Sequence, residues 1–497
     1  MNFPVVRMDR ARRRSTRILL TLGSLSFLSA CASIPAPTIG AGPKSATHYG
    51  MTTVDMTPST TSDHRAPPSN AQMDTPDVWP AANWWDNIGD PQLGQLITEA
   101  LADAPDMRAA EARARQAMAA AQFTKGDLLP SLGASASTQM QRQSYNLGFP
   151  APRGWDDNGR ISLDFGWDID FWGKNRAAYS AALSTARAAA AERDHAALAL
   201  SAAIASHYAD LAGLFADRDA AQDAVTVRTR TWELMSQRQQ NGLENRGAVE
   251  RAQSAQAQAL GELAATDEAI AVLQYRIAML MGQGPDRGAS ITRPTARGRI
   301  TAALPRELPL QLLGRRPDIM AARLRLDAAQ KHIDVAERSF YPNINLAAFI
   351  GLSSINLSQL LKNNSLIGGA GPALSLPLFQ GGKLRAQYRL SEADYDLAVA
   401  QYDQILAHAL GEVASIAKSM AMLENRLDHA RTAHQAAENA HRIANDRYRG
   451  GLANSLDVLA AEDALIATRR ARAALETRAL TLDIDLIRAL GGGYQNS

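Results

Sequence analysis

The chain is poor in the residues on which several classes of protein depend. Its 497 residues include a single cysteine, Cys31, which excludes an intrachain disulfide and a cysteine-based zinc site. Aromatic residues make up only 6%, which suits long, closely packed helices better than a bulky globular core. The formal net charge is only +2, and no basic face indicates a nucleic-acid partner.

Motifs of known catalytic chemistry are also missing. The sequence contains no HExxH, GxSxG, P-loop or glycine-rich dinucleotide fingerprint. His429, His434 and His441 fall on a late polar helix, where surface histidines are a better interpretation than metal ligands. Asp164 and Asp168 could form a catalytic dyad, but the strand pattern around them explains them better. We therefore expect no enzyme, no cofactor and no metal site.

The first thirty residues are typical of a lipoprotein signal peptide. Six arginines between positions 7 and 17 precede an apolar run from Ile18 to Leu28, which is too short to span a bilayer. The run ends in Leu28-Ser-Ala-Cys31, which resembles a bacterial lipobox. That resemblance implies cleavage before Cys31 and lipid attachment there, and Ala32 in the next position favours the outer membrane. Residues 31–80, rich in Pro, Ser, Thr and Gly, are expected to form a flexible lipidated tether.

A strand with two different faces leads directly into a very long helix. Between positions 161 and 169 apolar residues alternate strictly with polar ones, as expected for a wall between lipid and water. Asp164 and Asp168 are expected to face the water-filled lumen. After Gly173 the sequence stays compatible with a helix, without a proline, to about Asn241.

The same order of elements occurs twice. Pro105-Asp106 is echoed by Pro317-Asp318 at a spacing of 317 − 105 = 212, and Gly242-Leu243 by Gly451-Leu452 at 451 − 242 = 209. Each repeat reads helix, strand, strand, long helix, helix. The first helix is expected to begin at Pro91, after Asp90 as N-cap, and to run unbroken to about Lys125. The expected boundaries are repeat 1 at 81–282 (strands 131–143 and 160–170, long helix 174–241), a linker at 283–307, repeat 2 at 308–490 (strands 343–352 and 371–379, long helix 383–449) and a tail at 491–497.

Geometry then requires several copies of the chain. Helices of this length extend about 100 Å at 1.5 Å per residue, and two shorter helices stacked end to end would match one long helix. Four strands cannot close a membrane barrel, and an open sheet edge cannot face lipid. Several chains must therefore share one barrel, and the sequence itself allows a dimer or a trimer.

Several separated motifs together resemble the outer membrane factor family, the TolC-like channels, and in particular the lipoprotein branch called NodT-type efflux lipoproteins. Besides the lipobox and the repeat, the motifs are Trp84-Trp85 with Asp90-Pro-Gln-Leu93, Trp167-Asp-Ile-Asp-Phe-Trp-Gly173, Leu313-Gly-Arg-Arg-Pro-Asp318 and Phe340-Tyr-Pro-Asn-Ile344. The resemblance covers residues 80–490. It implies a homotrimer with a twelve-strand β-barrel in the outer membrane, continued by an α-helical barrel across the periplasm. It also implies a passive exit duct for drugs or other small molecules, docked to a periplasmic adaptor (a membrane fusion protein) and an inner-membrane pump, commonly of the resistance-nodulation-division type.

The sharp breaks after the long helices are expected to form the periplasmic entrance. The family closes its channel at these turns, and adaptors dock there. The candidates for docking are Gly242, Leu243, Gly451 and Leu452, and those for the gate are Tyr448, Arg449 and Asp457. Asp457 could instead be an ordinary first-turn acid favoured by the helix dipole. Two other functions stay open: a non-conducting trimeric scaffold or adaptor, and a duct for protein or polysaccharide secretion.

Overall fold

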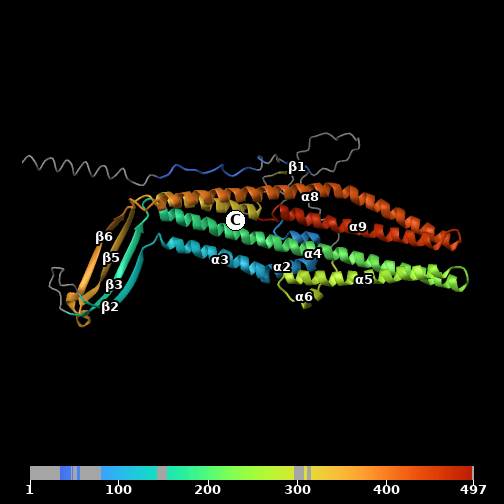
Figure 1. Cartoon of the computed structure of the whole chain (residues 1–497), viewed down its shortest axis with the longest axis horizontal. Coiled ribbons are helices and arrows are strands. Elements are labelled where there is room, and N and C mark those ends of the chain that lie inside the picture. The colour runs from blue at the N-terminus through green and yellow to red at the C-terminus, as the bar shows by residue number, and fades with distance from the viewer. Residues whose placement is uncertain are drawn as a thin grey trace, which may run out of the picture. The chain divides into compact units, whose positions relative to one another are not determined.

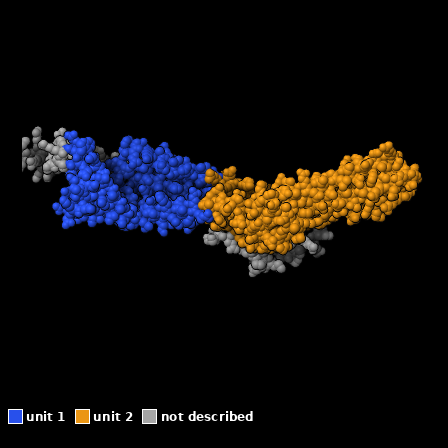
Figure 2. All heavy atoms as spheres, turned by 90° about the horizontal axis from the view of Figure 1, so that it is seen from below, with its two compact units in different colours: residues 1–42, 115–187, 324–400 blue, residues 43–114, 188–323, 401–497 orange. Residues whose placement is uncertain are grey.

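The computed structural model describes residues 34–45, 48, 53–55, 80–142, 154–295, 307–309 and 315–494. The signal peptide, Cys31 and most of the first hairpin loop lie outside these residues. The chain divides into two units, coloured in Figure 2. Unit 1 comprises residues 1–42, 115–187 and 324–400, and unit 2 comprises residues 43–114, 188–323 and 401–497.

Helices dominate the described residues (Figure 1). The helices longer than one turn are α2 (Pro91–Asp103), α3 (Pro105–Gly126), α4 (Lys174–Gln240), α5 (Arg246–Leu280), α6 (Pro285–Ala289), α7 (Pro317–Arg338), α8 (Lys383–Arg449) and α9 (Ser455–Ala489). Short 3-10 turns are η3 (Trp84–Ile88), η6 (Leu357–Gln359) and η7 (Asn363–Ser365). The strands are β1 (Thr53–Asp55), β2 (Ser131–Gln141), β3 (Asp156–Ile169), β4 (Glu307–Pro309), β5 (Asn343–Ile355) and β6 (Leu366–Ser375).

Unit 1 contains a four-stranded antiparallel sheet in the order β2-β3-β5-β6 (Figure 1). The two hairpins therefore lie side by side. The inner strand of the first hairpin, β3, pairs with the inner strand of the second, β5, so the sheet joins the two repeats. Leu163 pairs with Ala134 on one side and with Ile350 on the other. Within the part of the chain that the structure describes, the outer edges of β2 and β6 have no strand partner.

The second hairpin differs from the expected boundaries. The expected strand at 371–379 is instead Leu366–Ser375, and its partner extends to Ile355. The glycines at positions 368, 369 and 371 carry no hydrophobic signal, so pairing with β5 alone makes them a strand. Pro372 lies in β6, which is at the edge of the sheet within one chain, and Pro377 lies beyond the end of this strand.

The expected single helix from Pro91 to about Lys125 is wrong, because the structure has two helices there. The α2 helix ends at Asp103 and α3 begins at Pro105. A proline has no backbone N–H and disfavours helical geometry in the residue before it, so Pro105 serves as the first residue of a new helix. Asp90 does cap α2 as expected, since its Oδ1 accepts a 3.0 Å hydrogen bond from the N–H of Gln92.

In unit 2 the ends of the shorter helices meet in pairs. Gly282, just after α5, lies against Pro105 at the start of α3, and a Cβ at Gly282 would come within 2.3 Å of the proline ring. Gly491, just after α9, lies against the backbone of Arg315 and Arg316 at the start of α7. Both glycines have positive φ, +71° and +96°, which L side chains rarely adopt. The two repeats therefore use the same end-to-end junction.

Asp90 also organises the core of unit 2. Its buried Oδ2 accepts hydrogen bonds from the Tyr208 hydroxyl at 2.8 Å and from the Thr295 N–H at 2.7 Å. Burial alone would raise the pKa of Asp90, but these bonds together lower it. Trp84, Leu96 and Ile204 pack in the same apolar cluster. One carboxylate thus joins the start of α2 to α4 and to the linker after α6.

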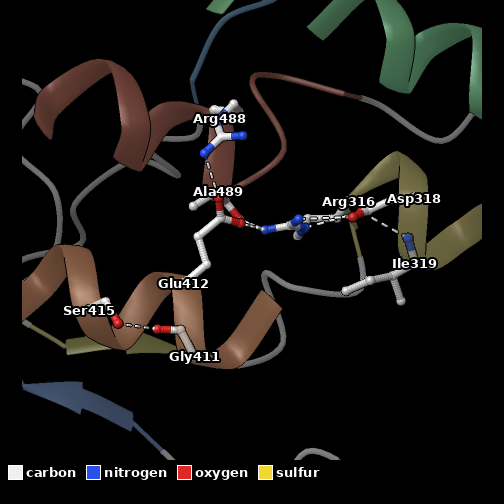
Figure 3. A network of polar contacts seen from close by, with 8 residues as sticks. All are labelled: Arg316, Asp318, Ile319, Gly411, Glu412, Ser415, Arg488 and Ala489. Atoms are coloured by element: carbon white, nitrogen blue, oxygen red, sulfur yellow. Dashed lines mark hydrogen bonds and ion pairs between the residues drawn. The ribbon is translucent and has the colours of Figure 1, made fainter. Parts of the chain in front are cut away.

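A second polar network fixes the start of α7 (Figure 3). The buried Arg316 guanidinium contacts both carboxylate oxygens of Asp318, a Glu412 oxygen at 2.9 Å and the Ala489 carbonyl at 2.9 Å. Arg488 donates to the other oxygen of Glu412 at 2.6 Å. Arg316 of the Leu313–Asp318 motif thus belongs to a polar network that connects α7, α8 and the end of α9.

Part of the expected tether lies against α8 in the residues that the structure describes. The N–H and hydroxyl of Thr38 donate to Glu392 at 2.7 and 2.8 Å, and the N–H of Gly40 donates to Asp396 at 3.0 Å. Ile34 packs beside Phe340 and Tyr388. Successive carboxylates of α8 therefore bind Thr38 and Gly40. Further along, β1 pairs with β4, which begins at the last residue of the expected linker, and α6 lies within that linker.

Candidate functional site

One face of the four-stranded sheet is lined by polar side chains. Asp164 Oδ2 accepts hydrogen bonds from Ser135 at 3.1 Å and from Ser162 at 3.0 Å. Asp168 accepts one from the Asn343 side chain at 3.1 Å. Directly opposed residues of paired strands lie on the same face, so this network extends over β2, β3 and β5. Both predicted lumen-facing acids therefore lie on one polar face.

The other face of the sheet is apolar and exposed. The residues on it alternate with those of the polar face along all four strands, and they include Leu132, Met140, Ile161, Leu163, Trp167, Ile350, Leu366 and Leu374. A soluble protein would cover such a surface, because leaving it in water is unfavourable. An apolar belt of this kind is typical of a sheet that faces lipid.

One aromatic ring interrupts the polar face. Phe349 pairs with Asp164, so it lies on the polar side, where the Arg160 guanidinium is 5.3 Å from its ring centroid. The opposite residue on β6 is Gly369, whose missing Cβ would lie 3.1 Å from the ring. The alternation of apolar residues at 344, 346, 348, 350 and 352 did not predict this position, because Phe349 falls between them.

The second candidate region, in unit 2, comprises the two turns that follow α4 and α8. Gly242 and Gly451 have left-handed φ values of +72° and +74°, which terminate the long helices. Asn245 and Asn454 then cap α5 and α9, each accepting a hydrogen bond from a backbone N–H three residues later. The turns are therefore built by the same residue types in both repeats.

Tyr448 links these two turns. Its side chain is 3% exposed and packs with Met235, Ala248 and Val458. Its hydroxyl lies 3.1 Å from Glu244 Oε2, to which it donates. Burial first, and then the bond to Glu244, raise the pKa of Tyr448, so the hydroxyl stays protonated and remains a donor.

Arg238 completes the contact, with its guanidinium 4.9 Å from the centroid of the Tyr448 ring. The sequence analysis missed Arg238 and Glu244. Glu244 lies inside the predicted turn, and Arg238 lies in the last turn of the preceding helix. Their positions beside the turn could have marked them as candidates.

The other predicted gate and docking residues are placed differently. Arg449 is exposed and has no ion-pair partner among the residues that the structure describes. Asp457 accepts from the Asn454 N–H at 3.2 Å in a reciprocal capping box, so the first-turn interpretation accounts for its position. Leu243 and Leu452 are 66% and 74% exposed, and they place one apolar side chain at each turn.

The histidines of α8 do not all lie on the surface as expected. His429 is exposed, but His434 and His441 are half-buried, and His441 lies 3.9 Å from the buried Glu462. Across the described ranges no group of three His, Cys, Asp or Glu residues could hold a metal ion.

The family model described as outer membrane efflux protein matches residues 96–283 and 308–492. The chain belongs to the outer membrane efflux protein family. Multidrug resistance outer membrane protein MdtQ of Escherichia coli O157:H7 is 30% identical over 433 residues, which are 84% of this chain and 89% of MdtQ. Fusaric acid resistance protein FusA of Burkholderia cepacia is 36% identical over 322 residues, which are 63% of this chain and 60% of FusA.

Solved structures of the family have the same fold. The outer membrane protein VceC of Vibrio cholerae superposes with a TM-score of 0.79 at 42% identity, over 84% of this chain and all of VceC. The expected TolC-like fold, mainly helical with a β-barrel part, is confirmed, as is the outer membrane location. This efflux protein is an exit duct in the outer membrane, and its family is a family of channels rather than enzymes.

Proposed function

We propose that three copies of this efflux protein close one twelve-strand barrel and export drugs or other small molecules received from a periplasmic adaptor and an inner-membrane pump. The observation that carries the proposal is the four-stranded sheet with one polar face, one apolar face and two outer edges that pair with no other described strand. An unpaired edge in lipid costs several kcal/mol per exposed backbone group, so β6 of one copy must pair with β2 of the next. Twelve strands would place Asp164 and Asp168 of each copy around a water-filled lumen.

The turns after α4 and α8 would form the periplasmic end of this duct. The exposed Leu243 and Leu452 offer two apolar anchors for the adaptor, one in each repeat. The Tyr448–Glu244–Arg238 cluster would hold the turns together while the duct is closed. A pump of the resistance-nodulation-division type would supply the substrate, as the family resemblance implies.

The lipobox supports a lipid anchor at Cys31. The residues that follow it support this placement, because Ile34 packs near Phe340, three residues before the start of β5. Three residues span about 10 Å at most, so a lipid on Cys31 would lie close to the membrane end of unit 1. Mass spectrometry of the mature amino terminus should find an acylated Cys31, and an unmodified peptide across residues 28–35 would contradict the anchor.

The duct can be tested with the purified protein in two measurements. Native mass spectrometry in detergent should give three chains per particle, and planar bilayers should show single-channel currents. A two-chain particle would contradict the shared twelve-strand barrel. Trimers that never conduct, under any applied voltage, would instead favour a scaffold.

A further inference from the structure

Two helical turns away from the Tyr448–Glu244–Arg238 cluster, called here the gate cluster, His441 of α8 and Glu462 of α9 face each other inside the protein. His441 precedes Tyr448 by seven residues on α8, and Glu462 follows Val458 by four on α9, so both pairs share helix faces. His441 Nε2 lies 3.9 Å from Glu462 Oε1, and the two side chains are 18% and 2% exposed.

Each member of the pair has a buried polar atom without a partner. In the described part of the chain, neither His441 Nε2 nor Glu462 Oε2 makes a hydrogen bond. Buried polar atoms in proteins are nearly always bonded, so an unsatisfied atom on each of two facing side chains needs an explanation. A proton on the imidazole supplies one, since an imidazolium and a carboxylate at this distance attract each other.

The surrounding charges leave Glu462 unbalanced when His441 is neutral. On α4, Arg228 is bonded to Asp463 of α9, so these two charges largely cancel. Thr231 of α4 donates to Glu462 Oε1 at 2.6 Å. Burial raises the pKa of Glu462, opposed by Thr231, Arg228 and His441 and assisted by Asp463. The next histidine on the same stripe of α8 is His434, two turns further from the tip.

We propose that His441 and Glu462 form a proton-operated clamp that holds α8 against α9 and α4 directly behind the gate cluster. With one proton on the pair, the imidazolium and the carboxylate attract each other and the helices are held together. As the pH rises and the pair loses this proton, the buried carboxylate is left without its counter-charge and the contact weakens. Acid therefore tightens this end of the helices, and alkali loosens it.

Hydrogen exchange on the purified full-length protein tests the clamp independently of conduction. After correction for intrinsic rates, we expect residues 441–449 and 455–465 to exchange at least about tenfold more slowly at pH 5.5 than at pH 8.5. Glu462→Gln and His441→Gln should abolish the pH dependence. His441→Lys keeps a positive charge beside Glu462 at both pH values, so it should stay protected at pH 8.5. His429→Gln, on the exposed face of the same helix, is the matched control and should behave like the wild type.

The clamp itself does not depend on the proposed gate. Only the effect of the clamp on conduction rests on that gate, and the results separate the two. Equal protection of the wild type at both pH values, or an unchanged pH dependence in Glu462→Gln, would overturn the clamp. If His441 acts only through packing, the His441→Lys variant should exchange faster than the wild type at both pH values. That result would also overturn the clamp. If exchange follows the prediction while bilayer conductance does not change with periplasmic pH, the clamp stands and the gate lies elsewhere.

Discussion

Single polar residues in this efflux protein connect helices that are far apart in the sequence. Asp90, Tyr448 and Arg316 each bond to residues at least 90 positions away, and each is buried. A buried polar group that loses its partner costs about 1–3 kcal/mol, so each of these residues is a point where one substitution has a large effect.

Asp90→Asn should lower the stability of unit 2 at neutral pH by about 1–3 kcal/mol, because a carboxylate that accepts two backbone and two hydroxyl hydrogen bonds becomes an amide. The folded-state pKa of Asp90 is lowered, so its contribution is present above its unfolded value and is lost as the pH falls through its folded value. Thermal unfolding at several pH values should therefore show a difference that shrinks in acid. Asp86→Asn, an exposed neighbour, should have little effect.

Tyr448→Phe should weaken the contact between the two turns by about 1 kcal/mol, because Glu244 loses its donor. Closed-channel conductance in planar bilayers should rise. Because the pKa of Tyr448 is raised, the contact is complete below the ordinary tyrosine value and is lost only as the pH rises through the folded value. The effect of the substitution should then be the same at pH 6 and pH 8. Tyr275→Phe, at an exposed site, should leave conductance unchanged.

At the scale of elements, strand register decides which side chains meet lipid. A shift of one residue would exchange the two faces of all four strands. The register of β3 with its neighbours places Phe165 opposite Leu132 and Ala348, on the face opposite to Asp164.

Substitutions at these adjacent positions should therefore differ sharply. Phe165→Arg places a charge on the lipid face, at a cost of about 2–4 kcal/mol near the membrane midplane, and should impair insertion into lipid vesicles. Asp164→Arg should insert normally, because it faces water. Gel-shift folding assays after insertion measure both variants, and equal defects would contradict the register.

At the scale of the whole molecule, the proposed trimer multiplies each polar residue by three. Asp164 and Asp168 would then give six carboxylates around one lumen. Replacing both with asparagine should reduce the preference for cations, measured as a reversal potential in a salt gradient across a bilayer. Asp103→Asn, an exposed acid on α2, is the control. An unchanged reversal potential would place these acids away from the ion path.

Local patterns in the sequence were enough to predict most elements and the family. The alternation from Ile161 to Ile169 marks a two-faced strand, and Gly242 and Gly451 mark the ends of the long helices. Both signals depend on residues close together in the chain, since side-chain period and left-handed backbone are local properties.

Contacts between distant residues could be decided only by the tertiary structure. The bonds of Tyr448 to Glu244 and of Asp90 to Tyr208 join positions 204 and 118 residues apart. No periodic pattern in the sequence predicts these contacts. The strand character of Gly368–Gly371 comes from β5, and the burial of His441 comes from α9. The sequence by itself determined the repeat, the strand faces and the helix ends, because these follow from local backbone and side-chain geometry. Packing between helices and between strands determined the partners of each buried polar group, because burial and hydrogen bonding depend on which surfaces meet.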